Sequence, residues 1–467
     1  MSFKFERVSV SDVCELIVDC VNKTAPKVEY ETQFKMIRTP NIRNGVINLD
    51  GCNYVSEETY KKWTRRATVE KDDILLTREA PMGEVGIIDF EDAVFLGQRI
   101  MQYRVNKSKL CPKFLLYSFL SSDLKNQFYQ HEGSGSVVSH IRVPDCLKFE
   151  INLPSLKIQR KISSFLWGVD QKIKNNNKMN QTFEQMAQAL FKSWFVDFEP
   201  VKAKIAVLEA GGSQEDATLA AMTAISGKDA NALVVFEREH PEYYAELKTT
   251  AELFPSAMQE GALGATPTGW KLGCIGDISH RIRTKVGSTS AVVLSAIASG
   301  DLVPSDEHFT KQVYSKSIEK YILVEQWSFA YNPSRINIGS IGLNVRNVNG
   351  AVSPVYVVFK TEQEYKWYVE ILTKTTYFKN NVNILASGSV RQSLSYDDLS
   401  SIPLCIPDVS IVNVFNEKYE GYLTFIEQYR NQNNTLISIR DTLLPKLLSG
   451  EITLPEAEQA VSEEENV

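Results

Sequence analysis

The chain has 467 residues, which is more than one ordinary domain holds, so two or three domains are expected. Its composition (43% hydrophobic, 23% charged) is typical of a globular protein, and no apolar run approaches the roughly 18–20 residues that cross a bilayer. The net charge of −6 argues against a nucleic-acid binder only superficially, because residues 201–262 carry −5 and residues 408–467 carry −7. Residues 1–154 are neutral, and residues 155–200 and 263–407 carry +3 each.

The first element is a predicted α+β domain over residues 1–154. Short β-branched segments bounded by Gly, Pro or Asp, such as Asp73–Thr77 and Val85–Ile88, predict strands. Residues Pro112–Tyr129 predict a helix that starts behind Pro112. The N-terminus has no apolar stretch of signal-peptide type, and the seven cysteines form no CxxC pair, so a cytoplasmic protein without a metal site is expected.

Residues 155–200 predict one long helix with a coiled-coil seam. Apolar residues and two asparagines recur at alternating steps of four and three, which is the a/d spacing of a coiled coil. The seam consists of Ile162, Leu166, Val169, Ile173, Asn176, Asn180, Phe183, Ala187, Leu190 and Trp194. A buried Asn in such a seam lowers stability but can fix the register by pairing with its counterpart on the other helix.

The rest of the chain repeats this plan after an interruption. Residues 201–262, rich in Ala, Glu and Gly, predict an acidic helical connector; residues 263–407 predict a second α+β domain; residues 408–452 predict a second long helix. Its seam consists of Phe415, Tyr419, Tyr422, Ile426, Tyr429, Asn433, Leu436, Arg440, Leu443 and Leu447. The acidic residues 453–467 predict a disordered tail.

The two halves are related by an internal repeat with an offset of 253 residues. Ser134-Gly-Ser-Val137 and Ile151-Asn-Leu-Pro154 recur as Ser387-Gly-Ser-Val390 and Leu404-Cys-Ile-Pro407. The offset continues through both seams, so that Asn180 and Asn433 occupy equivalent places. We therefore predict an α+β fold in which two globular domains are joined by two long antiparallel coiled-coil helices, with a pseudo-twofold repeat.

The signatures of common enzymes are missing from the sequence. There is no GxxxxGK[ST] phosphate loop, no GxGxxG after a predicted strand, and no HExxH. The nearest match to an Asn-Pro-Pro-aromatic methyltransferase cluster, Asn332-Pro-Ser-Arg335, lacks the second Pro and the aromatic residue. The nearest nuclease-like set, Asp145 with Glu150, lacks a lysine. No catalytic residue is therefore assigned.

Three segments carry a family resemblance. Leu153–Ile162 opens the first long helix, Ala189–Pro200 closes it, and Ile439–Ile452 ends the second. Together, and in this order, they resemble the helical regions of type I restriction–modification specificity subunits. The resemblance covers essentially the whole chain, although the second helix opens with Ile406-Pro-Asp-Val409 and lacks the Leu and Gln of the first copy.

The resemblance implies a non-catalytic subunit that reads a bipartite double-stranded DNA target, one half with each target-recognition domain. It implies as partners two modification (methyltransferase) subunits and restriction (endonuclease and translocase) subunits. S-adenosylmethionine, ATP and Mg would then be bound by these partners, and no cofactor by this chain. The helices would set the spacing between the half-sites, as the geometry of two readers on one face of a duplex requires.

Cationic side chains and small-residue loops are the residue types that contact phosphates and base edges. The candidates are Arg38, Lys61, Lys62, Arg65, Arg66, Ser134, Ser136 and Arg142 in the first domain, and Arg281, Arg283, Lys285, Arg335, Ser387, Ser389 and Arg391 in the second. The recurring Ser-Gly-Ser loops could bind phosphate through backbone N–H groups, or could be a shared turn of the fold.

Two other classes of function remain open at this stage. The chain could be a protein-interaction scaffold with two binding domains spaced by a coiled coil, which a specific DNA footprint would exclude. It could also be an enzyme whose motifs are not recognisable, which would require turnover by the pure chain.

Overall fold

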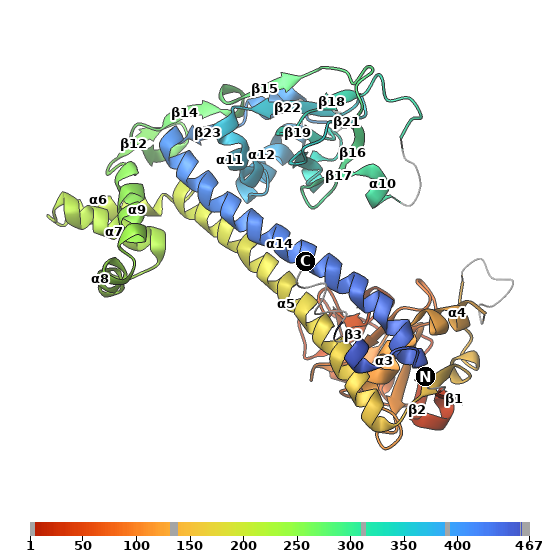
Figure 1. Ribbon diagram of the computed structural model, residues 1–467. Helices are drawn as coiled ribbons and strands as arrows, with labels where there is room; N and C mark the ends of the chain where they lie inside the picture. The colour runs from red at the N-terminus through yellow and green to blue at the C-terminus, as the bar shows by residue number, and fades with distance from the viewer. Residues whose placement is uncertain (1–4, 131–138, 310–313, 388–392, 458, 460–467) are drawn as a thin grey trace. The chain divides into compact units, whose positions relative to one another are not determined.

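A computed structural model describes residues 5–130, 139–309, 314–387, 393–457 and 459 (Figure 1). The chain divides into two units, one formed by the residues up to Lys178 together with those from Gln428 onward, the other by Met179–Glu427. Both long helices therefore contribute to both units. Among the described residues, no helix is long and apolar enough to cross a membrane.

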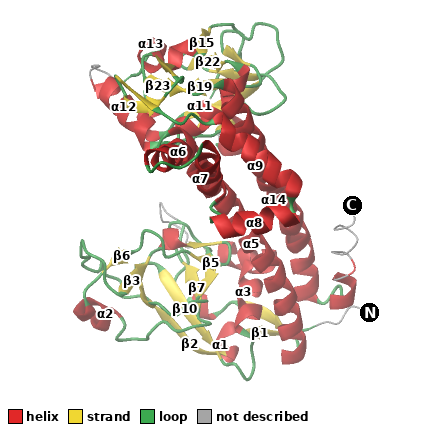
Figure 2. Cartoon of the chain, turned by 90° about the vertical axis from the view of Figure 1, so that its left-hand side faces the viewer, coloured by secondary structure: helices red, strands yellow, loops and turns green. Residues whose placement is uncertain are grey.

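The first unit contains domain 1, residues 5–154, built on small antiparallel and mixed sheets. Figure 2 shows strand β10 between β2 and β7. The strands are β1 (Glu6–Ser9) paired with β11 (Glu150–Leu153); the sheet β2 (Cys14–Asp19), β10 (Ile100–Val105), β7 (Ile74–Thr77), β8 (Val85–Ile87); the sheet β6 (Asn53–Tyr54), β3 (Phe34–Ile37), β9 (Ala93–Leu96); and β4 (Ile42–Arg43) with β5 (Val46–Ile47). The helices are α1 (Val10–Val13), α2 (Glu57–Trp63), α3 (Pro112–Leu120) and α4 (Ser122–Gln130).

The predicted helix Pro112–Tyr129 is broken at Ser121, which is a correction to the sequence interpretation. Ser121 has extended backbone angles (φ −68°, ψ 156°) and ends α3. Its hydroxyl donates to the Ser118 carbonyl at 2.6 Å and accepts from the Leu124 backbone N–H at 3.3 Å, at the start of α4. Serine competes with the helix for backbone hydrogen bonds in this way, so one segment becomes two helices.

The second unit contains domain 2, residues 263–407, and the connector. Its strands are β12 (Met258–Gly261) with β13 (Gly264–Pro267); β14 (Lys271–Cys274) with β23 (Pro403–Ile406); the sheet β15 (Ser279–Ile282), β22 (Val357–Thr361), β19 (Ser328–Tyr331), β20 (Ile341–Leu343); and the sheet β17 (Leu302–Pro304), β16 (Val292–Ala296), β21 (Gly350–Val352), β18 (Ile322–Val324). The domain's helices are α10 (Ser305–His308), α11 (Lys366–Leu372), α12 (Thr376–Ser387) and α13 (Tyr396–Ser400).

The sequence repeat is also a repeat of sheet topology. The sheet order β2-β10-β7-β8 recurs as β15-β22-β19-β20, and the parallel pair β3/β9 recurs as β16/β21. Gly86 in β8 and Gly342 in β20 occupy corresponding strands, and each is pressed against backbone. A Cβ atom on Gly86 would lie 3.1 Å from the Val46 carbonyl oxygen, and one on Gly342 would lie 2.6 Å from the Leu302 nitrogen. Glycine is needed where two backbones approach this closely.

The long helices α5 (Leu156–Phe195) and α14 (Val409–Ser449) pack on each other in an antiparallel manner (Figure 1). In the first unit the start of α5, with Leu166, shares a core with the end of α14, with Leu443. In the second unit the end of α5, with Trp194, contacts the start of α14, with Phe415, at 6.4 Å between ring centroids. The predicted fold class, two β-rich domains with two long helices packed together, is confirmed.

Every residue of the two predicted seams is buried or half-buried. In the first unit the polar member Asn433 is paired: its carboxamide oxygen accepts from Asn176 at 2.9 Å, and its amide donates to Asn177 at 2.8 Å. Nearby, Arg440 donates to Asp170 at 2.8 Å. The expected pairing of Asn433 with its counterpart Asn180 is therefore wrong: Asn433 pairs with Asn176 and Asn177, and among the described residues the buried Asn180 carboxamide oxygen has no hydrogen-bond partner.

The connector consists of α6 (Glu199–Glu209), α7 (Gln214–Ser226), α8 (Ala230–Glu239) and α9 (Pro241–Leu253) around a small apolar core. The Lys204 side chain is buried, and its ammonium group donates to the Phe254 carbonyl at 2.6 Å. Burial lowers the pKa of Lys204. The lysine thus ties the first connector helix to the residue that ends the last one.

The start of the predicted tail is described. Ala457 is fully buried in the core of the first unit, and its N–H donates to the Thr453 carbonyl at 3.1 Å. The prediction of a disordered tail concerns residues that, apart from 453–457 and 459, lie outside the described ranges.

Candidate nucleic-acid interface

In domain 1, loops from several strands meet at one place. The Thr39 hydroxyl, just after β3, donates to the Ala80 carbonyl, just after β7, at 2.8 Å. The Arg78 N–H donates to the Arg99 carbonyl, just before β10, at 2.7 Å. Because these bonds join backbone or near-backbone groups, the side chains that follow β3 and β7 and precede β10 are held in one cluster of loops.

The segment around Ile141 joins the same cluster. The Ile141 N–H donates to the Arg78 carbonyl at 2.9 Å, and Glu79 and His140 form an isolated β-bridge. Arg142 follows directly and is exposed, with its Nε 2.8 Å from an Asp145 carboxylate oxygen. Domain 1 therefore collects Arg38, Arg78, Arg99 and Arg142 on neighbouring loops.

The Asp145 carboxylate anchors the end of this segment. Its side chain is only 3% exposed and accepts from Lys148 at 3.0 Å and from Arg142 at 2.8 Å. Hydrogen bonds from Lys148 and then Arg142 lower the pKa of Asp145, so the carboxylate stays ionised at neutral pH. One exposed arginine of the cluster is thus already oriented by a fixed anion.

Helix α2 carries a second group of predicted cations. Lys61 is paired with Glu57 at 2.7 Å, the Lys62 ammonium lies 5.7 Å from the Trp63 ring centre, and Arg66 is paired with Asp19. Arg65 is exposed. The group is spread along one helix end, and Arg66 is partly used for holding the helix to β2.

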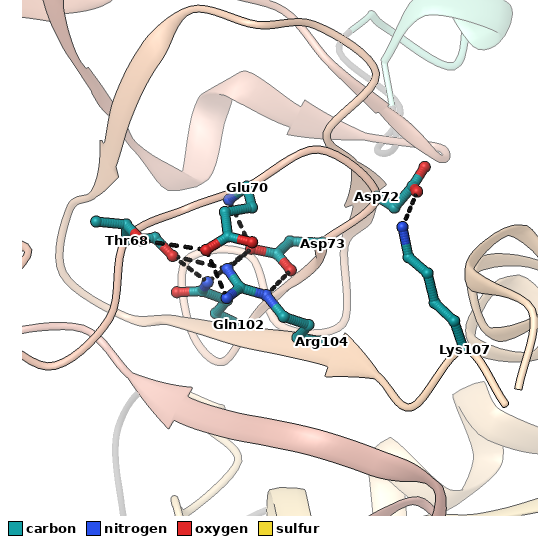
Figure 3. A network of polar contacts seen from close by, with 7 residues as sticks. All are labelled: Thr68, Glu70, Asp72, Asp73, Gln102, Arg104 and Lys107. Atoms are coloured by element: carbon teal, nitrogen blue, oxygen red, sulfur yellow. Dashed lines mark hydrogen bonds and ion pairs between the residues drawn. The ribbon is translucent and has the colours of Figure 1, made fainter. Parts of the chain in front are cut away.

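The segment after α2 is fixed by a polar network, drawn in Figure 3. The Asp73 carboxylate is 1% exposed and accepts from Arg104 through Nε at 2.9 Å and Nη2 at 2.8 Å. It also accepts from Gln102 at 2.7 Å and from the Glu70 N–H at 2.8 Å. Arg104 and Gln102 also donate to the Thr68 carbonyl, so strand β10 holds residues 68–73 in place.

In domain 2 the corresponding loops have a different chemistry. The Leu394 N–H donates to the Pro333 carbonyl at 3.2 Å, as Ile141 does to Arg78 in domain 1. The loop after β19 presents Asn332 and the exposed Arg335. The other predicted cations, Arg281 on β15 and Arg283 and Lys285 beyond it, are exposed along one edge of the domain.

Most residues of the predicted Ser-Gly-Ser loops lie outside the residues that the structure describes. Ser134, Ser136, Ser389 and Arg391 lie outside the described residues, and Ser387 is described only as the last residue of α12. Their roles stay predictions.

Sequence reasoning overlooked Arg78 and Arg99, which the fold places at the centre of the loop cluster. The available signal was their position directly after and directly before buried strands. Which strands are neighbours, however, cannot be read from that position. Among the described residues, no group of three or more His, Cys, Asp or Glu side chains could hold a metal ion. The arrangement offers arginine forks and exposed cations, which suit phosphate and base contacts.

Comparisons with known proteins point in the same direction. Residues 4–185 match the family model described as type I restriction modification DNA specificity domain. The chain is 30% identical over 409 residues to the specificity subunit of the type I restriction enzyme HindI from Haemophilus influenzae, covering 83% of this chain and 88% of that protein. It is 23% identical over 424 residues to the MjaIX specificity subunit of Methanocaldococcus jannaschii, covering 87% and 83%.

Among solved structures, the S subunit of a type I restriction-modification system from M. genitalium has a similar fold. The TM-score is 0.50 at 13% sequence identity, and the match covers 96% of each chain.

Proposed function

The chain belongs to the specificity subunits of type I restriction enzymes, and from this we propose that it reads a bipartite DNA target, with one globular domain for each half-site. As a DNA specificity subunit it is a non-catalytic component of such an enzyme. Domain 1 reads one half-site and domain 2 the other, and the two long helices set the number of base pairs between them.

One observation carries the proposal: the same sheet topology occurs twice, with different side chains on the corresponding loops. A duplicated scaffold can contact two stretches of DNA in the same manner, while different loop residues give each copy its own sequence preference. Mobile lids or a catalytic pocket are not needed for this role.

We assign the contacts with phosphates to the exposed cations and the reading of bases to the loop clusters. The proposed DNA-contacting residues are the predicted ones, Arg38, Lys61, Lys62, Arg65, Arg66 and Arg142 in domain 1 and Arg281, Arg283, Lys285, Arg335 and Arg391 in domain 2, with the Ser-Gly-Ser loops. Such contacts make binding fall steeply with salt concentration, because each neutralised phosphate releases counterions.

The chain acts within a complex. It recruits two modification subunits, which supply S-adenosylmethionine-dependent methylation, and restriction subunits, which use ATP and Mg; it binds no cofactor itself. The exposed faces of α5 and α14 are the proposed docking surfaces, and the seam residues hold the two helices together.

The test is a methylation map of DNA from cells that express the chain with its modification subunits, compared with cells that lack the chain. A split motif, methylated only when the chain is present, is the expected result. Exchanging residues 1–150 for those of a relative should then change one half of the motif and leave the other half and the spacing intact. A change in both halves at once would contradict the assignment of one domain to each half-site.

A further inference from the structure

The strand register defines an equivalent pair of positions in the two domains. In domain 1, Ile100 on β10 pairs with Thr77 on β7, so that Arg99 and Arg78 are the next residues outward. In domain 2, Val357 on β22 pairs with Tyr331 on β19, and the next residues outward are Tyr356 and Asn332. The repeated scaffold therefore has two arginines in domain 1, the exposed Arg99 and the half-buried Arg78, where domain 2 has a tyrosine and an asparagine.

Arg99 has a backbone conformation that side chains disfavour. Its φ is +72°, in the left-handed region, where glycine is the usual residue. The conformation is held because the Arg99 carbonyl accepts the Arg78 N–H at 2.7 Å. Non-glycine residues held in this region occur more often at functional sites than elsewhere. An arginine at this position therefore carries backbone strain that a glycine would not.

The Arg99 side chain is exposed and oriented at the same time. The side chain is 47% exposed, and its Nε lies 3.2 Å from a carboxylate oxygen of Glu79, whose side chain is 27% exposed. Because Glu79 engages Nε, the end-on edge formed by the two terminal nitrogens of the guanidinium is left for another acceptor. A planar fork presented in this way matches the O6 and N7 acceptors of guanine in the major groove.

The equivalent place in domain 2 offers no such fork. Tyr356 and Asn332 are half-buried, and the Asn332 side-chain oxygen accepts the Ser334 N–H at 3.1 Å. The neighbouring Val355 is 67% exposed. None of these side chains supplies the planar pair of donors that an arginine offers to a guanine edge.

We propose that Arg99, positioned by Glu79, reads a guanine in the half-site of domain 1. The proposal rests on the proposed function, because it specifies the bases that one of the two readers recognises. Arg99 contacts the base, and Glu79 acts through Arg99 as a positioning residue.

The experiment compares Arg99→Gln with Lys125→Gln in the complete complex with the modification subunits. Both changes replace one exposed cation of domain 1 by an amide, and Lys125 lies on α4, outside the loop cluster. Methylation maps are recorded for wild type and for both variants. Glutamine pairs with adenine edges, so Arg99→Gln should lower methylation of sites that carry guanine at one position of the domain 1 half-site roughly 5- to 150-fold and favour sites that carry adenine there. Lys125→Gln should leave every base preference unchanged.

Glu79→Gln separates positioning from structure. It should weaken the preference at the same single guanine and leave the other positions of the motif as they are. A general loss of structure would instead lower methylation of all sites together and leave the base preferences as they are.

A readout that needs no variant covers the case in which Arg99→Gln does not fold. Duplexes carrying the wild-type motif are synthesised with 7-deazaguanine, which lacks the N7 acceptor, at each guanine in turn. The wild-type complex should bind more weakly to the duplex in which 7-deazaguanine replaces one particular guanine of the domain 1 half-site.

Three results would overturn the proposal: an unchanged motif with Arg99→Gln, an equal weakening at every position, or no effect of 7-deazaguanine anywhere in that half-site. Absence of any split motif with the wild-type chain would instead refute the proposed function.

Discussion

The Asp73–Arg104 pair allows a quantitative test of the polar network in domain 1 (Figure 3). Replacing Arg104 by Met removes a bidentate partner from a carboxylate that is 1% exposed. Breaking a buried ion pair from one side typically costs about 3–5 kcal/mol, because a charge is left without compensation. Asp73 keeps the Gln102 amide at 2.7 Å and the Glu70 N–H at 2.8 Å. The loss should therefore lie at the lower end, about 3 kcal/mol of unfolding free energy.

Hydrogen exchange followed by mass spectrometry measures this loss locally, since the chain has several domains and does not unfold in two states. Peptides from β7 and β10 should exchange faster in Arg104→Met. Lys107→Met is the matched control: Lys107 pairs with Asp72 at 2.6 Å, but its side chain is 64% exposed, and such pairs contribute at most about 1 kcal/mol.

A double-mutant cycle with Asp73→Asn completes the test. Removing both charges together should cost clearly less than the two single changes added, because no unpaired charge remains. If Arg104→Met had no larger effect than Lys107→Met, or if the two single effects were additive, Asp73 and Arg104 would not be coupled in the way that their geometry indicates.

Three further predictions concern single positions. The Asp277 carboxylate accepts the Cys274 N–H at 2.7 Å, and this bond, with nearby hydrogen bonds, lowers the pKa of Asp277 to about 2. The stabilisation that the ionised carboxylate provides should therefore be complete above pH 4 and be lost as the pH falls towards 2. An NMR titration that returns a pKa near 4, or an unaltered acid profile in Asp277→Asn, would contradict this. Gly168→Ala should raise the free energy of unfolding by about 0.5–1 kcal/mol, because the added Cβ on α5 meets no atom within 4 Å. Gly342→Ala should lower it by about 1–3 kcal/mol, because its Cβ would lie 2.6 Å from the Leu302 backbone nitrogen. Local hydrogen exchange around each position measures both effects, and a change in the same direction in the two variants would refute the packing argument.

The predicted seams show how far local reasoning reaches. The steps of four and three between residues such as Leu166 and Val169 are a property of consecutive turns, so the sequence alone located both long helices. The repeat of short motifs around Pro154 and Pro407 also indicated two related domains. The particular partners of Asn433 were not predictable, because Asn176 and Asn177 lie more than 250 residues away in the chain.

The candidate interface shows where that reasoning ends. Exposed cations on a single element, such as Lys61 and Arg65 on and beside α2, could be picked from the sequence. The cluster around Arg78 and Arg99 could not, because it depends on β10 pairing with β7 and on Ile141 bonding to Arg78. The break at Ser121 was missed for a related reason: apolar periodicity continues through a residue whose hydroxyl ends one helix and begins the next.

The sequence by itself determined the order of the domains, the two long helices and the family to which the chain is similar. These features follow from periodicities and short motifs, each of which involves residues that are close together in the sequence. Only the tertiary structure decided which loops meet, which arginine is positioned by a carboxylate, and which buried charges are paired. Strand pairing joins segments far apart in sequence, and its register is set by packing and backbone hydrogen bonds that form only once the sheets have assembled.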